Sequence, residues 1–238
     1  MDAIILAAGQ GKRLGSPFGQ KPKTLIEINS KTLLERIIFG LSRIDANSIG
    51  IVTGFEAHQF KNVIEKFSIN ISSRIKIIEN EEYENLGSFY SLFLALQHFS
   101  TQGVWIFDSD IIFDEKLFST ILTYDCSSSA LCCTELTDNP DKVLVSMKHN
   151  KVTQIGKLSR VDFTADKRLL EYIGVLYLDV SHINILQNLD ESFYVEEYES
   201  VINKLLNSMN FTVINLGDMR WNEIDTMEDY QNVLEFWN

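Results

Sequence analysis

The chain has 238 residues, of which 45% are hydrophobic and 23% charged, so it is long and apolar enough to fold around a sizeable core. Its formal net charge of −12 argues against a nucleic-acid partner, because binding to a phosphate backbone requires a basic surface. The spacing of Cys126, Cys132 and Cys133 fits neither a disulfide framework nor a C-x-x-C metal site, and we expect reduced thiols.

Few residues precede the apolar run Ala3–Ala8, and they carry no basic segment of the kind that begins a secretory leader. No apolar run approaches the roughly 20 residues that a membrane-spanning helix needs. We therefore expect a cytoplasmic protein that makes no membrane contact. The sequence makes no prediction about its oligomeric state.

In the first half of the chain, the apolar pattern alternates between that of a buried strand and that of an amphipathic helix. The alternation predicts βαβ units and a largely parallel sheet. Between them, Thr24–Ile28 is a short extended segment and Glu79–Asn85 a loop. The predicted strands are Ala3–Ala8, Ser48–Thr53, Ile75–Ile78 and Val104–Phe107, and the predicted helices are Thr32–Leu41, Ala57–Phe67 and Gly87–Phe99.

The second half is less regular. We expect Ala130–Glu135 and Val143–Lys148 to pair as antiparallel strands, with Val152–Ile155 following the turn at His149–Asn150. No linker or repeat divides the chain, so we predict one α/β domain over residues 1–238, with a nucleotide-binding half at 1–125 and an acceptor-side half at 126–238. The remaining predicted elements are strands Glu171–Leu178 and Phe211–Leu216 and helices Val195–Leu206 and Met227–Trp237.

The loop after the first predicted strand combines glycines with cations. Gly9 and Gly11 permit backbone conformations that turn N–H groups inward, and small residues let the backbone approach a ligand closely. Lys12, Arg13 and Lys23 follow within a short distance along the chain. This combination predicts a site for phosphates.

Two common glycine motifs do not fit this loop. The dinucleotide fingerprint G-x-G-x-x-G is excluded because Leu14 stands at the third glycine position. The P-loop G-x-x-x-x-G-K-[ST] is excluded because Leu6 stands at its first glycine and Arg13 replaces the hydroxyl residue.

The segments Leu6–Arg13 and Pro22–Lys23 instead read L-A-A-G-x-G-x-R followed by P-K, and this pattern resembles the N-terminal signature of nucleotidyltransferases that activate sugars and small phosphorylated alcohols. The resemblance implies a Rossmann-like three-layer α/β/α sandwich with a mostly parallel mixed sheet and a small acceptor-side subdomain. It implies that Arg13 contacts the phosphates of the nucleotide and that Lys23 stabilises charge on the reacting phosphate. The other nucleotide-binding positions are Leu6, Ala7, Ala8, Gly9, Gly11 and Lys12.

Two carboxylates, Asp108 and Asp110, follow the predicted strand Val104–Phe107, at the strand end where open α/β sheets bind ligands. Their spacing on an extended chain points both side chains the same way, and such a pair requires a cation, for which Mg²⁺ is the natural candidate. By the resemblance, Asp225 completes a metal site with Asp110, and Asp108 assists. The alternative role for Asp225 is the N-cap of the helix that starts near Met227.

The turn Asn85–Leu92 resembles the segment with which this family reads the base, and Gly87 and Ser88 match its G-[TS] pair. The runs Phe89–Leu92 and Trp221–Asp225 resemble those of bacterial cytidylyltransferases that make CDP-choline and related compounds. CTP is therefore the predicted nucleotide.

The acceptor site is the least defined. Aromatic and acidic side chains hold a quaternary ammonium through cation–π contacts and charge, and Glu171-Tyr172-Ile173-Gly174 resembles the E-x-x-G acceptor motif of sugar nucleotidyltransferases. Tyr198 and Glu197 are further members of such an aromatic and acidic set. The candidate acceptor residues are Glu171, Tyr172, Gly174, Tyr194, Glu196 and Glu223.

Together these features predict a Mg²⁺-dependent cytidylyltransferase. It would transfer CMP from CTP to phosphocholine, an aminoethylphosphonate or a phosphorylated amide such as glutamine phosphate, release pyrophosphate, and serve surface polysaccharide or lipid modification. Two alternatives stay open: a sugar-1-phosphate nucleotidyltransferase that uses UTP, dTTP or GTP, and a nucleotide-sensing domain without turnover.

Overall fold

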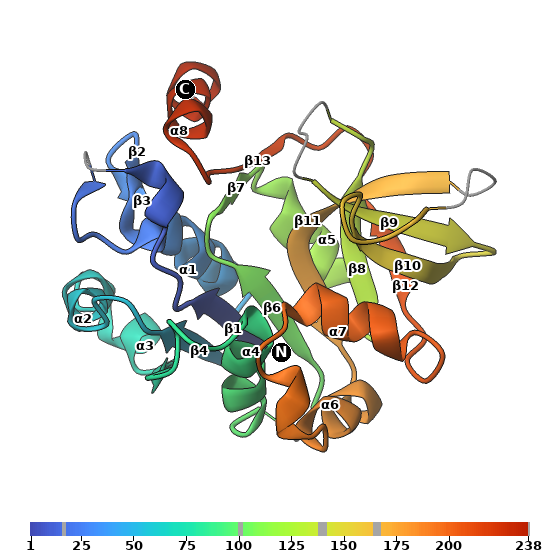
Figure 1. Cartoon of the computed structure of the whole chain (residues 1–238). Helices are drawn as coiled ribbons and strands as arrows, with labels where there is room; N and C mark the ends of the chain where they lie inside the picture. The colour runs from blue at the N-terminus through green and yellow to red at the C-terminus, as the bar shows by residue number, and fades with distance from the viewer. Residues whose placement is uncertain (16–17, 100–101, 138–141, 164–167, 238) are drawn as a thin grey trace.

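The computed structural model describes residues 1–15, 18–99, 102–137, 142–163 and 168–237. Its centre is a nine-stranded sheet in which β1, β4, β5 and β6 run parallel and β11 lies antiparallel beside β6 (Figure 1). The strand order is β10-β9-β11-β6-β1-β4-β5, with β8 against β11 and β12 against β8. The strands are β1 (Asp2–Ala7), β4 (Ser48–Thr53), β5 (Ile75–Glu79), β6 (Val104–Asp108), β8 (Ala130–Thr134), β9 (Val143–Lys148), β10 (Lys151–Lys157), β11 (Arg168–Leu178) and β12 (Thr212–Asn215).

Helices cover both faces of this sheet. Those on one face bury their apolar side chains in a core with Ile4 and Ile106, and those on the other pack around Ile5 and Phe107, because successive residues of a strand point to opposite faces. Figure 1 shows the first group in front of the sheet and α1 and α5 behind it. The first group is α4 (Ser88–Leu96), α6 (Val180–Gln187) and α7 (Tyr198–Leu205), and the second is α1 (Leu33–Arg43), α2 (His58–Ile64) and α5 (Lys116–Thr123).

Smaller elements form a third core at one end of the sheet. The hairpin of β2 (Glu27–Ile28) and β3 (Lys31–Thr32), the pair of β7 (Ile111–Phe113) and β13 (Trp221–Glu223), and α8 (Met227–Phe236) meet there. The 3₁₀ turns Lys12–Leu14 and Lys23–Leu25 belong to the same region, and α3 (Ile69–Ser72) follows α2.

The junction of β11 and α6 is built around Asp179. One of its carboxylate oxygens caps α6 by accepting from the backbone N–H groups of Ser181 (2.8 Å) and His182 (3.0 Å). The other accepts from the backbone N–H (3.0 Å) and the hydroxyl (2.9 Å) of Ser129, just before β8. Burial opposes ionisation, but these hydrogen bonds outweigh it and lower the pKa of Asp179 to about 2.

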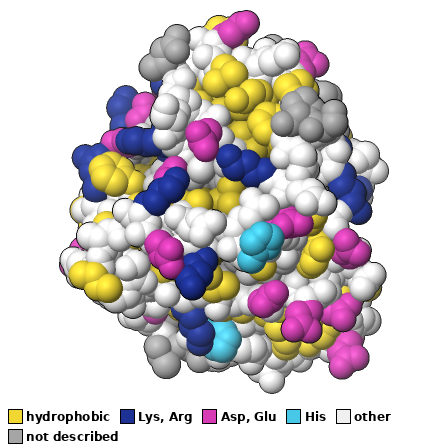
Figure 2. All heavy atoms as spheres, turned by 90° about the vertical axis from the view of Figure 1, so that its left-hand side faces the viewer, with side chains coloured by type: hydrophobic (Ala, Val, Ile, Leu, Met, Phe, Trp, Pro, Cys, Tyr) yellow, Lys and Arg dark blue, Asp and Glu magenta, His cyan; other side chains and the backbone are white. Residues whose placement is uncertain are grey.

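The surface is mixed in charge. On the side formed by α2, α3 and the β2–β3 hairpin, Lys and Arg side chains are interspersed with acidic and uncharged ones (Figure 2). Among the residues that the structure describes, no helix is long and apolar enough to cross a bilayer.

The predicted α/β fold with a mostly parallel mixed sheet is confirmed. The predicted pairing of Ala130–Glu135 with Val143–Lys148 is wrong. The eleven-residue strand β11 lies between them and pairs with β9 through its first residues and with β8 through later ones. The turn at His149–Asn150 does join β9 to β10, and both of its residues have positive φ, as a two-residue hairpin turn requires.

Candidate active site

The side chain of Lys23 lies at the centre of the candidate site. Its ammonium is 2.7 Å from a carboxylate oxygen of Asp110 and also pairs with Asp225, which in turn pairs with Arg13. Burial alone would lower the pKa of Lys23, but the two carboxylates outweigh it and raise the pKa above its usual value. The sequence separates these residues by as much as 212 positions, and the fold brings them into contact.

A third carboxylate completes this group. Oxygens of Asp110, Glu223 and Asp225 lie within 4.8 Å of one another. Burial, together with the charges of the other two carboxylates, raises the pKa of Glu223 to about 8. Three carboxylates this close repel one another when they are ionised, and a divalent cation between them would remove that repulsion. Oxygen ligands of this kind fit a cation of the Mg²⁺ type.

Local structure holds the cluster in place. Asp110 follows β6 and its backbone carbonyl accepts from the N–H of Ile224 (2.9 Å), which ties it to the segment that carries Asp225. The alternative role of Asp225 as a helix N-cap is wrong. The cap of α8 is Thr226, whose hydroxyl accepts from the N–H of Asp229 (3.2 Å) in a capping box.

The loop after β1 borders two hollows beside Lys23. Gly11 needs to be glycine, because its φ is +62° and a Cβ there would lie 3.0 Å from the Cβ of Lys23. The first of the two hollows, which we call the loop hollow, has a volume of about 400 Å³. Its lining includes Gly9, Gly11, Lys12, Arg13 and Lys23. The second, the strand-end hollow, has about 230 Å³, and its lining includes Leu6, Ala7, Ala8, Gly9, Lys23, Gly87, Ser88, Asp108 and Asp110.

Gly87 and Ser88 line the strand-end hollow, but both also join α4 to the segment before α7. The N–H of Gly87 donates to the carbonyl of Tyr194 (2.8 Å), and a Cβ on Gly87 would lie 2.0 Å from the carbonyl oxygen of Glu196. The hydroxyl of Ser88 accepts from the N–H of Tyr198 (3.0 Å). The glycine is thus explained by close packing, and the Ser88 hydroxyl keeps its proton for a ligand.

A third hollow, the mixed-charge cleft, extends from the carboxylate cluster toward α7 and has a volume of about 240 Å³. Tyr172, Gly174 and Glu223, three of the predicted acceptor residues, line it. Its charged and aromatic lining includes Arg13, Lys142, Lys157, Asp108, Asp110, Glu197, Glu199, Glu223, Asp225, Tyr172, Tyr198 and Trp221.

The structure places the other three predicted acceptor residues away from this cleft. Glu171 is buried and its carboxylate accepts from the backbone N–H (2.6 Å) and hydroxyl (3.0 Å) of Thr137. Tyr194 packs against Phe93, with ring centroids 4.8 Å apart, and Glu196 pairs with Lys204 (2.5 Å). These contacts serve packing and surface charge.

Asp108 does not join the carboxylate cluster as expected. It accepts a 2.7 Å hydrogen bond from the hydroxyl of Tyr198, which lies 3.1 Å from that of Tyr172. Burial raises the pKa of Asp108 well above its usual value, and nearby Glu199 and Asp110 raise it further. Of these groups, Asp108 lines both the strand-end hollow and the mixed-charge cleft, and the two tyrosines line the cleft.

Several lining residues were missed by the sequence analysis. Lys142, just before β9, and Lys157, at the end of β10, reach the cleft far from any motif. Asn80 and Tyr83 reach the strand-end hollow from the segment after β5. Of the missed positions, only those in the acidic and aromatic run before and within α7 could be suspected from the sequence. The sequence analysis predicts Glu196 from this run, whereas the structure places Glu199 in the cleft. Burial raises the pKa of Glu199 to about 7.

Comparison with known proteins identifies the family. The family model for a MobA-like NTP transferase domain matches residues 3–139. The choline-phosphate cytidylyltransferase of Streptococcus pneumoniae (strain ATCC BAA-255 / R6) is 23% identical over 244 residues, which cover 99% of this chain and 97% of that protein. The 2-aminoethylphosphonate cytidylyltransferase of Lancefieldella rimae is 27% identical over 126 residues, or 52% of this chain and 49% of that protein.

Among solved structures, the inositol-1-phosphate CTP transferase from T. maritima has a TM-score of 0.82 at 22% identity, with 98% of this chain and 93% of that chain covered. At this identity, the similarity shows that the two proteins share a fold. The predicted resemblance is confirmed: the chain belongs to the family of MobA-like NTP transferase domains and is a nucleotidyltransferase.

Proposed function

We propose that the protein is a cytidylyltransferase that transfers CMP from CTP to a small acceptor carrying a phosphate or phosphonate group and an amine, and releases pyrophosphate. The names of the relatives support the nucleotide, since those that match include cytidylyltransferases for choline phosphate and 2-aminoethylphosphonate. Phosphorylated amides belong to the same range of small acceptors.

The observation that carries the acceptor class is the mixed-charge cleft beside Lys23. Its lining includes Lys142 and Lys157, which suit an anionic group, and Glu199, which suits an ammonium. Glu197 also lines it but already pairs with Arg160. The hydroxyls of a sugar phosphate can also donate to carboxylates, but only an ammonium adds charge attraction to the acidic half of the cleft. A zwitterionic acceptor is complementary to both halves.

The chain's own residues then perform a displacement at phosphorus. An oxygen of the acceptor phosphate attacks the α-phosphorus of CTP in line, the bond to the bridging oxygen breaks, and pyrophosphate leaves with the electron pair. Arg13 and Lys12 line the loop hollow, where the triphosphate would bind. Lys23 lines the loop hollow and the strand-end hollow, and its partner Asp110 lines all three hollows. Both reactants are anionic, so catalysis consists mainly of positioning and charge compensation.

The carboxylates of Asp110, Glu223 and Asp225 would hold Mg²⁺. The chemistry that a bound Mg²⁺ supplies is neutralisation of charge on the phosphate oxygens. The roles of Asp110 and Asp225 follow the family resemblance, and the proximity of Glu223 adds a third oxygen donor.

Pyrophosphate release tests this proposal. The enzyme would be incubated with CTP, UTP, dTTP or GTP and with phosphocholine, 2-aminoethylphosphonate, glucose 1-phosphate or glycerol phosphate, with and without Mg²⁺. We expect release with CTP and an amine-bearing acceptor, and loss of release with a chelator. Release only with a hexose 1-phosphate would overturn the acceptor class, and no release with any pair would leave the nucleotide-sensing alternative.

A further inference from the structure

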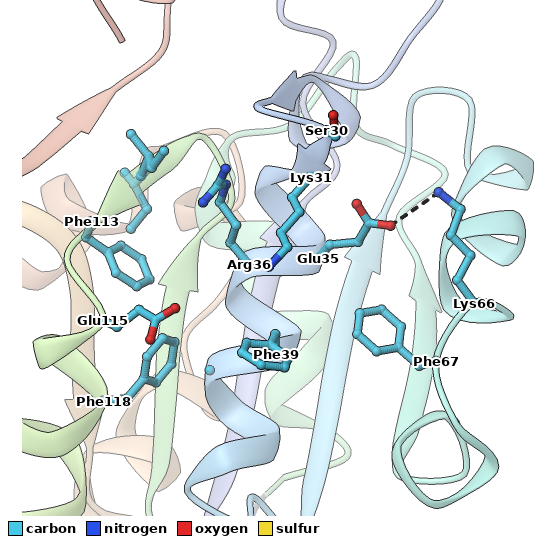
Figure 3. A pocket seen from close by; sticks show the side chains of 13 residues that line it. Ser30, Lys31, Glu35, Arg36, Phe39, Lys66, Phe67, Phe113, Glu115 and Phe118 are labelled. Atoms are coloured by element: carbon cyan, nitrogen blue, oxygen red, sulfur yellow. Dashed lines mark hydrogen bonds and ion pairs between the residues drawn. The ribbon is translucent and has the colours of Figure 1, made fainter. Parts of the chain in front are cut away.

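A further cavity lies away from the candidate active site and is not lined by the motif-bearing loops (Figure 3). Its walls come from α1, from β7, from α5 and from Lys66 and Phe67, which follow α2. Its volume is about 240 Å³. Figure 3 shows the rings of Phe39, Phe67, Phe113 and Phe118 around it, with charged side chains at its rim. We call it the aromatic cavity.

The sequence builds the apolar wall of the aromatic cavity with a glycine. A Cβ on Gly40 would lie 1.8 Å from the ring of Phe118, so the missing side chain is what lets this ring lie against α1. At the rim, Phe39 is 46% exposed, which is unusual for a phenylalanine that faces a concave surface.

Part of the charge around the aromatic cavity is already compensated. Glu35 pairs with Lys66 (3.2 Å), as the dashed line in Figure 3 marks, and Glu115 pairs with Arg43. Both acidic residues of the lining are thus engaged by cations.

Two cations of the lining, Lys31 and Arg36, form no direct ion pair in the part of the chain that the structure describes, although the charges of Glu35 and Glu115 act on Arg36. Lys31 stands 5.3 Å from the ring centroid of Phe39, and Arg36 donates from one terminal nitrogen to the carbonyl of Ile28 (2.5 Å). The Nε of Arg36 is buried without a hydrogen-bond partner among the described residues, and a guanidinium with unused donors is the usual receptor for an oxyanion.

We propose that the aromatic cavity binds a small anion with a ring-sized apolar body: a carboxylate, phosphate or sulfonate on an aromatic or alicyclic ring. The ring enters between Phe39, Phe67 and Phe113, and the anionic group faces Lys31 and Arg36. A pocket with mostly apolar walls and a few convergent polar groups is the general form of a small-molecule site.

Occupancy of the aromatic cavity acts on the active site through β7. Ile111 lines both the aromatic cavity and the mixed-charge cleft, and it directly follows Asp110. It also pairs with Glu223 across the β7–β13 ladder. A ligand that moves β7 therefore moves two carboxylates of the cluster, and this regulatory consequence, unlike the binding itself, rests on the proposed function.

Binding is tested with naphthalene-1-sulfonate as the probe, by calorimetry on the full-length protein, with neutral naphthalene-1-methanol as the matched compound. Lys31→Glu reverses the rim charge at an exposed position, and Lys61→Glu makes the same change at a side chain that is 76% exposed and lies outside the lining. We expect Lys31→Glu to weaken probe binding about tenfold and Lys61→Glu to change it by less than about twofold.

Equal binding by the two variants, or equally tight binding of the neutral compound, would overturn the proposed site. Hydrogen exchange measures the coupling without catalysis. We expect the probe to change exchange in peptides covering β7 and β13, and we expect Lys31→Glu to need about tenfold more probe for the same change. Unchanged exchange at saturating probe refutes the coupling. A failed transfer assay refutes the proposed function and leaves the calorimetric result to decide the cavity.

Discussion

Replacing Gly174 by alanine tests why the E-x-x-G segment ends in glycine. Gly174 has a φ of +76°, and a Cβ there would lie 2.7 Å from Oδ2 of Asp108. The left-handed conformation costs an alanine about 1–2 kcal/mol, and forcing an atom against a packed neighbour adds about 1–3 kcal/mol. The carboxylate that has to give way is the one that accepts from Tyr198, so the substitution also disturbs the buried polar chain.

Gly217 supplies the matched control. Its φ is +63°, but nothing lies within 4 Å of the position that a Cβ would occupy, so Gly217→Ala carries the conformational cost alone. Equilibrium unfolding in urea would measure both variants against the wild type, with the slope on denaturant checked for constancy. We expect Gly174→Ala to lose about 1–3 kcal/mol more than Gly217→Ala.

Equal losses in the two variants would refute the steric argument and return Gly174 to the acceptor role that the family resemblance gives it. A second measurement separates these readings further. If the glycine serves to seat Asp108, then Gly174→Ala lowers kcat for CMP transfer, whereas an acceptor contact shows mainly in the KM for the acceptor.

Three further predictions concern single charges. Lys23→Ala should lower kcat by about two to four orders of magnitude, while Lys21→Ala, two residues away and 38% exposed, should leave it near the wild-type rate; similar rates in both would misplace the central cation. Asp225→Asn should lose most turnover with its fold intact by circular dichroism, and Asp218→Asn, at an exposed position, should not; near-normal rates for Asp225→Asn at saturating Mg²⁺ would place the metal elsewhere. The lowered pKa of Asp179 contributes about 2 kcal/mol of stability above pH 4, and this contribution is lost as the pH falls toward 2. The difference in the free energy of unfolding between the wild type and Asp179→Asn, measured by urea titration, should therefore shrink over that range. A constant difference would contradict this.

The first half of the fold was predictable because its strands are buried on both faces and therefore read as continuous apolar runs. The bounds of Ser48–Thr53 match β4 residue for residue, and helix α1 begins one residue after Thr32, which is its N-cap. Predicted Ala57–Phe67 is longer than α2, since the chain leaves the helix after Ile64.

The elements that the sequence did not reveal are those defined by distant partners. β7 and β13 have three residues each, too few for any period to show, and each exists only because the other lies beside it. Helices α5 and α6 were also missed, and the partner of β8 was misassigned because pairing depends on the path of β11.

The same division applies to the candidate site. Arg13, Lys23, Asp110 and Asp225 stand in motifs of fixed spacing, and the structure brings them together. Lys157 and its neighbours in the cleft stand in no motif, because a side chain that meets a variable acceptor needs only the right position and charge.

The β7–β13 ladder explains how one short element contacts both the carboxylate cluster and the aromatic cavity. Along β7, the side chains of Ile111 and Phe113 enter the core behind the central sheet, and that of Ile112 enters the core shared with α8. Three ladder positions supply few hydrogen bonds, so packing in these two cores fixes where Asp110 and Glu223 stand. Packed contacts switch between discrete arrangements more readily than they stretch. A ligand inserted beside Ile111 and Phe113 therefore reaches the carboxylates through the contacts that position them, whereas a ligand on an outer helix would have to act through the whole sheet.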